Sequence, residues 1–241
     1  MRKTTVRRDL GLFFVSFLLA ASSSALVLHA GQKKAPAGSL LIADKGKLNL
    51  FLDGQSIGHE EFDIAWSGGG WVAKGTTRLA VQGSPPTTVS GTLTLRPNGA
   101  PVSYDWTSQT DKTNSAHIDF ANGVAKMLLQ MQGAHSFEQD LTFGSPMVVV
   151  LDNNLYHQYA ILARLYDWAH RGEQSFSVIV PQQLTPGTIK VEAPGALTAE
   201  GKSYEGLKVT TEDIELTLYL DPNHKLMRLE VPASKAAVVR E

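Results

Sequence analysis

Cysteine is absent from all 241 residues of the sequence. Its absence excludes disulfide bonds, thiol nucleophiles, thiolate zinc sites, c-type haem attachment and lipidation at a lipobox cysteine.

The sequence also lacks an excess of positive charge. Residues 1–9 hold four of the 22 cations and one of the 23 anions, so the chain from Gly31 onward has 18 against 22, a net charge of −4. A mildly acidic body argues against binding to nucleic acid.

Sequence motifs of cofactor and metal sites are also missing. The chain has no P-loop, no dinucleotide-binding fingerprint and no EF-hand loop, so we expect no cofactor. His59-Glu60-x-x-Asp63 imitates the helix of zinc proteases, but on a strand His59 and Asp63 lie about 13 Å apart and cannot share an ion. The other candidate histidines, His117, His135 and His224, have no partners at metal-ligand spacing, so we expect no metal site.

The first 30 residues are typical of an export signal. The basic residues 1–9 precede the 21 mostly apolar residues of Leu10–Ala30. This order predicts a signal peptide cleaved near Ala25 or Ala30, although the apolar stretch is also long enough for an uncleaved membrane anchor. Arg7-Arg8 leaves the twin-arginine route open beside the general secretory route. In either case we expect the body in the periplasm or cell envelope, with membrane contact only through residues 10–30 if they are retained.

The remainder divides into a short spacer and one domain. Residues 31–39 are small, basic and proline-containing, which is typical of a flexible spacer. Hydrophobic residues make up 43% of the chain and charged residues 19%, which excludes disorder and provides for a large core. No linker-like stretch interrupts the chain after Leu40, so we expect residues 40–241 to form a single β-roll domain.

Short runs in which apolar and polar residues alternate fill the chain after Leu40. Glycine, proline, asparagine and aspartate break these runs about every ten residues, which is typical of antiparallel sheet. Asp53-Gly54, Asn98-Gly99 and Asn122-Gly123 stand between alternating runs and predict hairpin turns. We expect about a dozen strands.

One segment, Leu155–Ala169, departs from this alternation. Its apolar residues recur every three or four positions, and only a helix brings such positions onto one face. Asp152, Asn153 and Asn154 are the expected N-cap residues, and Gly172 is the expected stop. Apolar residues cover most of the helix circumference, so the sheet should enclose it. We therefore predict a mainly β fold in which a large curved antiparallel sheet, a β-roll or half-barrel, wraps around one long helix.

Three segments, residues 90–106, 151–168 and 218–232, carry a resemblance to a known group. The chain from residue 40 to 240 resembles exported bacterial proteins of unknown function that form spiral β-rolls, a group that includes envelope-integrity proteins. It is more loosely similar to the half-barrel carriers that shuttle lipoproteins. The resemblance implies a role in the periplasm or envelope without established catalysis, and it supplies no catalytic residue.

Gly54-Gln55-Ser56-Ile57-Gly58 matches the G-x-S-x-G pattern of hydrolase nucleophile elbows. That elbow joins a strand to a helix, whereas Asp53-Gly54 predicts a hairpin and the following residues alternate as a strand. We therefore expect Ser56 to be an ordinary hairpin residue, and we keep a serine hydrolase only as the less favoured alternative. No other catalytic set is present, so we expect a protein that is not an enzyme.

Two groups near the expected helix are candidate binding residues. The aromatic side chains of Tyr156, Tyr159, Tyr166 and Trp168 are suited to line a cavity for an acyl chain or another apolar ligand, or to fill the core. The polar cluster at the helix start comprises Asp152, Asn153, Asn154 and His157, which cap the helix or bind a polar ligand.

Arg164 and Asp167 lie three positions apart and are expected to form an exposed ion pair.

These observations favour an exported, non-catalytic envelope protein that binds an apolar or amphipathic ligand, such as a lipid, or an envelope protein. The alternative is a purely structural or interaction module in which the helix fills the roll completely. A cavity of several hundred Å3 beside the helix would favour the first hypothesis.

Overall fold

The computed structural model describes residues 35–211 and 214–241. These residues form 15 strands, one α-helix and two short 3-10 helices, so the prediction of a mainly β chain with one helix is confirmed. The strands are β1 (Asp44–Leu52), β2 (Gln55–Ser67), β3 (Gly70–Leu79), β4 (Thr87–Leu95), β5 (Pro101–Gln109), β6 (Thr113–Ala121), β7 (Val124–Met131), β8 (Phe137–Thr142), β9 (Val148–Val150), β10 (Gln174–Val180), β11 (Thr185–Ala199), β12 (Lys202–Thr210), β13 (Glu215–Leu220), β14 (Leu226–Val231) and β15 (Ala236–Arg240). The helices are α1 (His157–Leu165), η1 (Pro181–Gln183) and η2 (Pro232–Ser234).

All 15 strands belong to one sheet, in the order β8-β7-β6-β5-β4-β3-β2-β1-β15-β14-β13-β12-β11-β10-β9. Neighbouring strands are antiparallel except β9 and β10, which are parallel and are connected through α1. Strands β1 and β15 pair in the middle of the sheet, with Leu50 opposite Val238. The sheet therefore consists of two antiparallel meanders, β1–β8 and β10–β15, joined along this β1–β15 seam, and β9 adds to the edge of the second meander in parallel.

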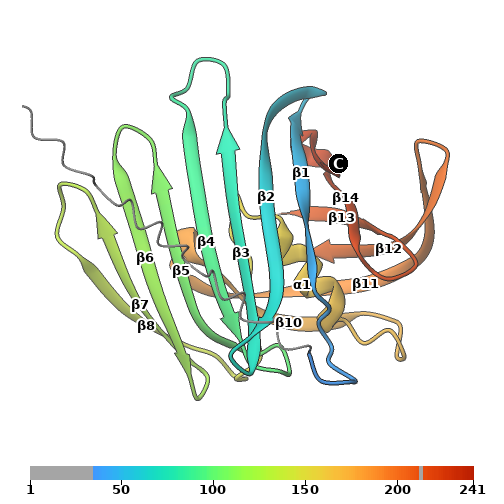
Figure 1. Ribbon diagram of the computed structural model, residues 1–241, viewed down its shortest axis with the longest axis horizontal. Coiled ribbons are helices and arrows are strands. Elements are labelled where there is room, and N and C mark those ends of the chain that lie inside the picture. Colours follow the sequence, from blue (N-terminus) through green and yellow to red (C-terminus); the bar gives the residue numbers. More distant parts are fainter. Residues whose placement is uncertain (1–34, 212–213) are drawn as a thin grey trace, which may run out of the picture. The chain divides into compact units, whose positions relative to one another are not determined.

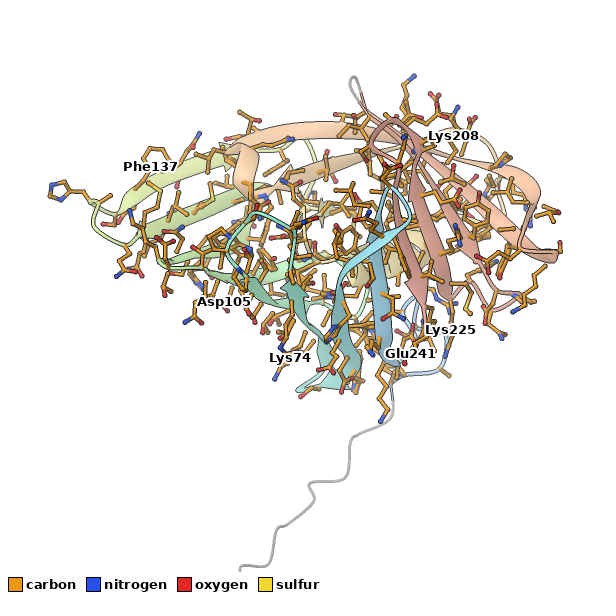
Figure 2. All side chains as sticks on the ribbon, turned by 90° about the horizontal axis from the view of Figure 1, so that it is seen from above. Lys74, Asp105, Phe137, Lys208, Lys225 and Glu241 are labelled. Carbon is orange, nitrogen blue, oxygen red and sulfur yellow. The ribbon has the colours of Figure 1, made fainter. Side chains whose placement is uncertain are left out.

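The sheet curves around the helix, as the sequence predicts. Strands β2–β8 stand side by side in Figure 1, strands β10–β13 cross behind them, and α1 lies between the two groups. The view from above in Figure 2 shows the same curvature. Both meanders therefore present a face to the helix.

The core follows the alternation of the strands. Inward positions that are paired across five neighbouring strands form one continuous buried row, Ala73, Leu93, Tyr104, Ile118 and Met127. On α1 itself, Ile161, Leu162 and Ala163 are successive residues and all are buried. Three successive helical residues point in three different directions, so protein surrounds the helix on most sides.

Helix α1 is nine residues long and shorter than the predicted Leu155–Ala169. It ends where Tyr166 takes an extended conformation, with φ −63° and ψ 130°. Leu155 and Tyr166 are nevertheless buried, at 0% and 2% exposure. The apolar pattern thus continues past both ends of the helix, which explains why the pattern predicts a longer one.

The three predicted hairpin turns are present. Asp53 and Gly54 have φ values of 49° and 78°, and Asn122 and Gly123 have values of 52° and 77°. Two successive left-handed residues are the signature of the hairpin turn that asparagine, aspartate and glycine favour. Gly99, with φ 85°, lies in the turn between β4 and β5.

The expected export signal, residues 1–30, and the first part of the expected spacer lie outside the described residues. In the described part of that spacer, the Ser39 hydroxyl accepts a hydrogen bond of 3.1 Å from Trp71 Nε1. None of the helices in residues 35–211 and 214–241 has the length and hydropathy needed to cross a membrane.

Candidate functional site

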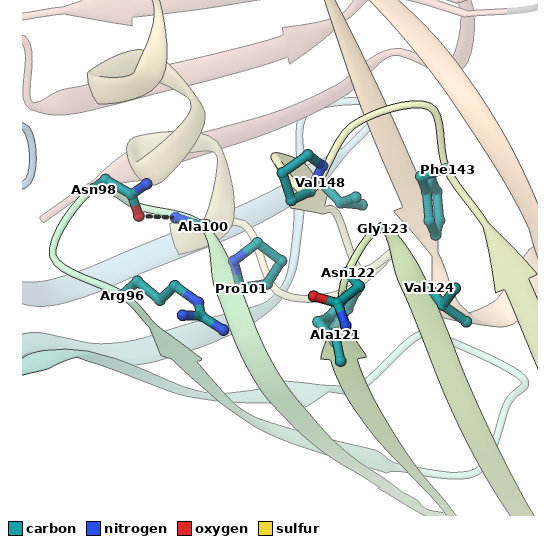
Figure 3. Close-up of a pocket in the computed structure, with 12 residues that line it drawn as sticks. Arg96, Asn98, Ala100, Pro101, Ala121, Asn122, Gly123, Val124, Phe143 and Val148 are labelled. Carbon is teal, nitrogen blue, oxygen red and sulfur yellow. Dashed lines mark hydrogen bonds between the residues drawn. The ribbon is translucent and has the colours of Figure 1, made fainter.

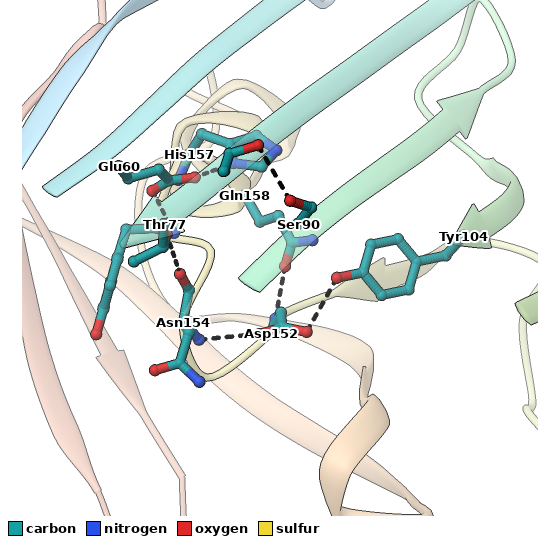
Figure 4. Close-up of polar contacts among 10 residues, drawn as sticks. Glu60, Thr77, Ser90, Tyr104, Asp152, Asn154, His157 and Gln158 are labelled. Carbon is teal, nitrogen blue, oxygen red and sulfur yellow. Dashed lines mark hydrogen bonds and ion pairs between the residues drawn. The ribbon is translucent and has the colours of Figure 1, made fainter. Parts of the chain in front are cut away.

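A buried polar cluster lies where the chain enters α1 (Figure 4). We call it the helix-anchor cluster. Its members are Glu60 of β2, Tyr104 of β5, Asp152 of the β9–α1 connection, and His157 and Gln158 of α1. Each of the five side chains has an exposure of 1% or less. The cluster therefore connects two strands of the first meander to the start of the helix in the interior of the protein.

The Glu60 carboxylate binds the first turn of the helix. Oε1 accepts a hydrogen bond of 2.5 Å from His157 Nδ1. Oε2 accepts bonds from the backbone N–H groups of Tyr156 and His157, at 2.8 and 3.2 Å. Helix N-termini leave such N–H groups unpaired and favour negative charge, so a strand carboxylate occupies the place of an N-cap side chain.

The prediction that Asp152, Asn153 and Asn154 cap the helix was therefore wrong. The N-cap residue is Tyr156, and it forms no side-chain cap hydrogen bond. The physical reason is that Glu60, 96 residues before Tyr156, already accepts from the first N–H groups.

Asp152 organises the second half of the cluster. Its carboxylate accepts hydrogen bonds from the Tyr104 hydroxyl at 2.9 Å, Gln182 Nε2 at 2.7 Å and the Asn154 N–H at 2.9 Å. Its own N–H donates to Gln158 Oε1 at 2.5 Å. Burial raises the pKa of Asp152, while the hydrogen bonds from Asn154, Gln182 and Tyr104 act in the opposite direction. Burial and the Asp152 charge together raise the pKa of Tyr104 well above its usual value, so this hydroxyl remains a neutral donor.

Two glycines make room for the cluster in the sheet. Gly75 of β3 and Gly91 of β4 are directly paired. A Cβ atom on Gly75 would lie 2.5 Å from His157 Cε1 and 2.6 Å from Glu60 Oε1, and one on Gly91 would collide with Leu155. The absence of side chains at this pair lets the helix start approach the sheet closely.

The predicted polar cluster at the helix start is only partly brought together. Asp152 and His157 both belong to the helix-anchor cluster, and Asn154 joins it through its backbone N–H, which donates to the Asp152 carboxylate at 2.9 Å. The Asn154 carbonyl also accepts a 2.5 Å bond from the Thr77 hydroxyl. Asn153 is exposed and lines the edge cavity described below. Because the buried members are out of reach of solvent, their arrangement suits anchoring the helix rather than binding a ligand.

The four predicted ligand-lining aromatic residues have different positions. Tyr159 is partly exposed and lines a cavity described below, and burial raises its pKa. Burial also raises the pKa of the half-buried Tyr156 to about 12. Tyr166 is buried and donates to the Gly172 carbonyl at 2.8 Å. Trp168 stacks on His224 with ring centroids 3.9 Å apart. Of the four, Tyr159 is therefore the one that the geometry places beside a cavity.

The expected ion pair of Arg164 with Asp167 is not present. Asp167 follows the end of α1 and contacts His170, whose Nδ1 lies 2.7 Å from its carboxylate. Arg164 is partly buried, and burial lowers its pKa, while the charges of Asp221 and Asp44 raise it. The helix ends before Asp167, so the three-residue spacing no longer places the two side chains on one face.

Two half-open cavities flank the β8–β9 connection. The first, which we call the rim cavity, has a volume of about 510 Å3 and lies between that connection and the β4–β5 and β6–β7 turns. The second, the edge cavity, has a volume of about 560 Å3 and lies between the connection, Tyr159 and strands β10–β12. Phe143 lines both cavities, so it separates them.

The rim cavity combines apolar walls with one cation (Figure 3). Pro101, Phe120 and Val148 are buried residues of its apolar wall. Arg96 is the charged residue of its lining and extends from the β4–β5 turn toward Asn122 of the β6–β7 turn. The cavity can therefore hold an apolar group with a negatively charged end near its mouth.

A third cavity, of about 630 Å3, lies beside Trp66 and Trp71 under the segment 35–43. Its lining contains no charged residue, and the hydroxyl of Ser39 already pairs with Trp71. It offers volume and apolar surface but no charged group that would orient a ligand.

The sequence does contain a signal for Glu60, which its resemblance to a zinc-protease motif obscures. Glu60 shares the alternation of Phe62 and Ile64, so a carboxylate occupies the inward phase of a strand. A charge in that phase must find a partner in the core. Arg96 has no comparable signal, since its neighbours Pro97 and Asn98 mark only a turn.

Ser56 lies at the start of β2, is exposed and is paired with Phe51 across the hairpin, as expected of an ordinary hairpin residue. Within the described part of the chain, no group of three or more histidine, aspartate or glutamate side chains could hold a metal ion.

Comparisons with known proteins identify a fold. No family model matches the sequence, and no curated protein is detectably similar to it. The chain is similar to the crystal structure of a β-barrel-like protein of the domain of unknown function DUF1849 from Brucella abortus, with a TM-score of 0.54 and 11% identity over 83% of this chain and 95% of that chain. A DUF1089 family protein from Pseudomonas aeruginosa gives a TM-score of 0.47 at 11% identity, over 75% of this chain and 91% of that chain. The Brucella likeness shows a shared β-barrel-like architecture among proteins of unknown function.

Proposed function

We propose that this protein is a non-catalytic protein of the cell envelope that binds a small apolar or amphipathic ligand, such as a lipid, in the cavities beside the β8–β9 connection. The observation that carries the proposal is the pair of cavities of about 510 and 560 Å3 separated by Phe143. Both volumes fall within the range of small-molecule sites, roughly 300–1,000 Å3. Export is inferred from the basic and apolar order of residues 1–30.

The position of the titratable groups supports a role without catalysis. Glu60, Asp152 and His157 would be suited to acid–base chemistry, but each is at most 1% exposed. A substrate must come within hydrogen-bond distance of a catalytic acid or base, roughly 2.6–3.2 Å. The helix and sheet around this cluster leave no such access, which favours a structural role for it.

Binding can be tested on the purified full chain with phenylnaphthylamine, a neutral dye whose fluorescence rises in apolar surroundings. Ala121→Trp should block the rim cavity and Thr188→Trp the edge cavity, since both residues are exposed members of a cavity lining. We expect one or both variants to reduce the fluorescence increase. Thr107→Trp, on an exposed position of β5 that belongs to neither lining, is the matched control.

Mass spectrometry of lipids and proteins that co-purify with the native protein provides an independent measurement. A stoichiometric lipid would support the proposal. Absence of bound lipid together with no fluorescence increase in the unsubstituted protein would contradict it.

A second candidate function is a structural or interaction module without a small-molecule ligand. It is favoured by the filling of the roll, because Leu155, Leu162 and Ile161 of the helix region are at most 3% exposed. If the dye does not bind and an envelope protein co-purifies instead, this second function replaces the first.

A further inference from the structure

We propose that the rim cavity binds the head group of a singly charged carboxylate amphiphile, such as a fatty acid, through the guanidinium group of Arg96. This inference rests on the proposed function, because it names the class of ligand for one of the two cavities. It assigns a role to a residue that the sequence alone does not single out.

Arg96 lacks the acidic partner that most arginines of the protein have. Four of the six arginines in the described residues, Arg78, Arg171, Arg228 and Arg240, form ion pairs with a carboxylate. Arg164 is half-buried, and the charges of Asp221 and Asp44 interact favourably with its guanidinium group. Arg96 is exposed and has neither an ion pair nor a side-chain hydrogen bond within residues 35–211 and 214–241. Its five N–H donors are thus available to a ligand.

No acidic residue in the lining of the rim cavity competes with a ligand for Arg96. The lining of the rim cavity has no aspartate or glutamate, whereas the whole chain contains 23 such residues and carries a net charge of −1. A cavity with one uncompensated cation in an acidic protein selects a ligand with a single negative charge over a neutral or a positive one. A guanidinium group binds a carboxylate in a bidentate manner, which also fixes the orientation of the ligand.

The backbone that holds Arg96 is well fixed. Arg96 N–H donates to the Ala100 carbonyl at 2.8 Å, and the Arg96 carbonyl accepts from Gly99 N–H at 2.9 Å. Gly99 in turn lies against Leu165 at the end of α1, because a Cβ atom on Gly99 would be 2.5 Å from Leu165 Cδ2. A rigid turn reduces the entropy that the protein loses when the ligand binds.

The apolar part of the ligand has a place beside the head group. Phe120, Phe143 and Val148 are each at most 8% exposed and provide an apolar wall. Phe143 also lines the edge cavity, so its ring belongs to the walls of both cavities. An acyl chain with its carboxylate at Arg96 can therefore extend along the wall toward the β8–β9 connection (Figure 3).

The test compares two fluorescent probes with the same acyl chain, cis-parinaric acid with a charged head group and its methyl ester with a neutral one, on the purified full chain. We expect the acid to bind at least about tenfold more tightly than the ester. Arg96→Gln should remove most of this preference, because it should weaken the binding of the acid and leave the binding of the ester unchanged. Arg96→Lys should retain part of it, because lysine keeps the charge and loses the bidentate geometry. The matched control is Arg78→Gln, which removes an exposed arginine that already pairs with Glu61.

A second variant places a carboxylate in the cavity and leaves Arg96 itself in place. Ala121 is an exposed member of the lining, so the carboxylate of Ala121→Glu should pair with the charge of Arg96. We expect this variant to weaken the binding of the acid but not that of the ester. Thermal unfolding of each variant checks that the fold is retained, and Ala121→Glu and Arg96→Lys keep the proposal testable if Arg96→Gln unfolds.

The outcomes separate the two proposals. Equal binding of acid and ester, unaffected by Arg96→Gln, would overturn the role of Arg96 and leave ligand binding intact. If Arg78→Gln lost the preference for the acid to the same extent, the role of Arg96 would also be overturned, because the effect would then come from the overall charge of the protein. Failure of both probes to bind would contradict the proposed function and this inference with it.

Discussion

Glu60 and His157 are 97 residues apart in sequence, yet His157 Nδ1 lies 2.5 Å from Glu60 Oε1 and both side chains are shielded from solvent. His157 also stacks on Phe62, the next inward residue of β2, with ring centroids 5.9 Å apart. One strand thus holds the histidine by its ring edge and by its face. This contact fixes where the helix begins relative to the sheet.

Glu60→Gln should lower the free energy of unfolding by about 1.5–3 kcal/mol, because an amide cannot accept both the histidine and the backbone N–H bonds, and bonds to charged groups have this magnitude. Chemical denaturation measures the loss. The neighbouring Glu61→Gln removes an exposed partner of Arg78 and should change the same quantity by less than about 1 kcal/mol. Similar small losses in both variants would show that Glu60 does not anchor the helix.

Gly75→Ala should destabilise the protein by about 1–3 kcal/mol, since the added methyl group would displace His157 or Glu60 in a closely packed region. Gly144→Ala is the control, because nothing lies within 4 Å of the added atom, and its effect should stay within about 0.5 kcal/mol. Equal unfolding midpoints for the two variants would contradict the close approach of helix and sheet at Gly75.

Leu162→Ala should cost about 2–5 kcal/mol, because this residue is 0% exposed and the surrounding sheet cannot collapse into the space. Leu162→Met conserves most of the volume and should cost less than about 1.5 kcal/mol. Denaturant titration of both variants distinguishes them. A loss below about 1 kcal/mol for the alanine variant would mean that the helix lies loosely on the sheet.

His117 should titrate above its ordinary pKa of 6.5, because Asp105 and Asp119 hydrogen-bond its ring. Its Nδ1 lies 2.7 Å from Asp105, and its Nε2 lies 3.2 Å from Asp119. The raised pKa means that these contacts favour folding fully below pH 6.5 and lose their effect as the pH rises through the folded-state value. Proton NMR titration of the ring measures the pKa, and Asp105→Asn should lower it. An unchanged titration in that variant would argue against the contact.

Ser56→Ala should leave stability and ligand binding nearly unchanged, because Ser56 is an exposed hairpin residue with no buried partner to lose. Labelling with a serine-directed fluorophosphonate probe provides the decisive measurement. A stoichiometric adduct at Ser56 that disappears in the variant would establish the hydrolase alternative.

The fold class and the turns could be predicted from sequence because their causes are local. Asp53-Gly54 and Asn122-Gly123 favour left-handed turns wherever they occur, and alternation alone places Phe62 and Ile64 on the inward face. The enclosure of the helix follows equally from the apolar residues around its circumference. These features need no knowledge of distant parts of the chain.

The partners of the inward polar residues could not be predicted in the same way. The alternation puts Glu60 inside, but the position of His157 in space depends on the curvature of the whole sheet. The N-cap was missed for this reason, because a distant carboxylate competes with the nearby Asp152 for the same N–H groups. The end of the helix was missed because Tyr166 is buried whether it is helical or extended.

The sequence gives little signal for strand β15, because Ala236–Arg240 is only five residues long and shows no clear alternation. The rim cavity was missed because turns from separate hairpins form it, and no single segment records that proximity.

The seam between β1 and β15 also has a kinetic consequence. Leu48 pairs with Arg240, and the Arg240 guanidinium holds both carboxylate oxygens of Asp44, at 3.0 and 2.6 Å. Within each meander every strand pairs with its neighbour in sequence, so these pairings close only short loops. The seam instead closes a loop that spans nearly all the described residues. Long-range closure of this kind slows folding. The seam can therefore form only after residues 236–240 have been synthesised, and we expect its pairing to be one of the slow steps of folding.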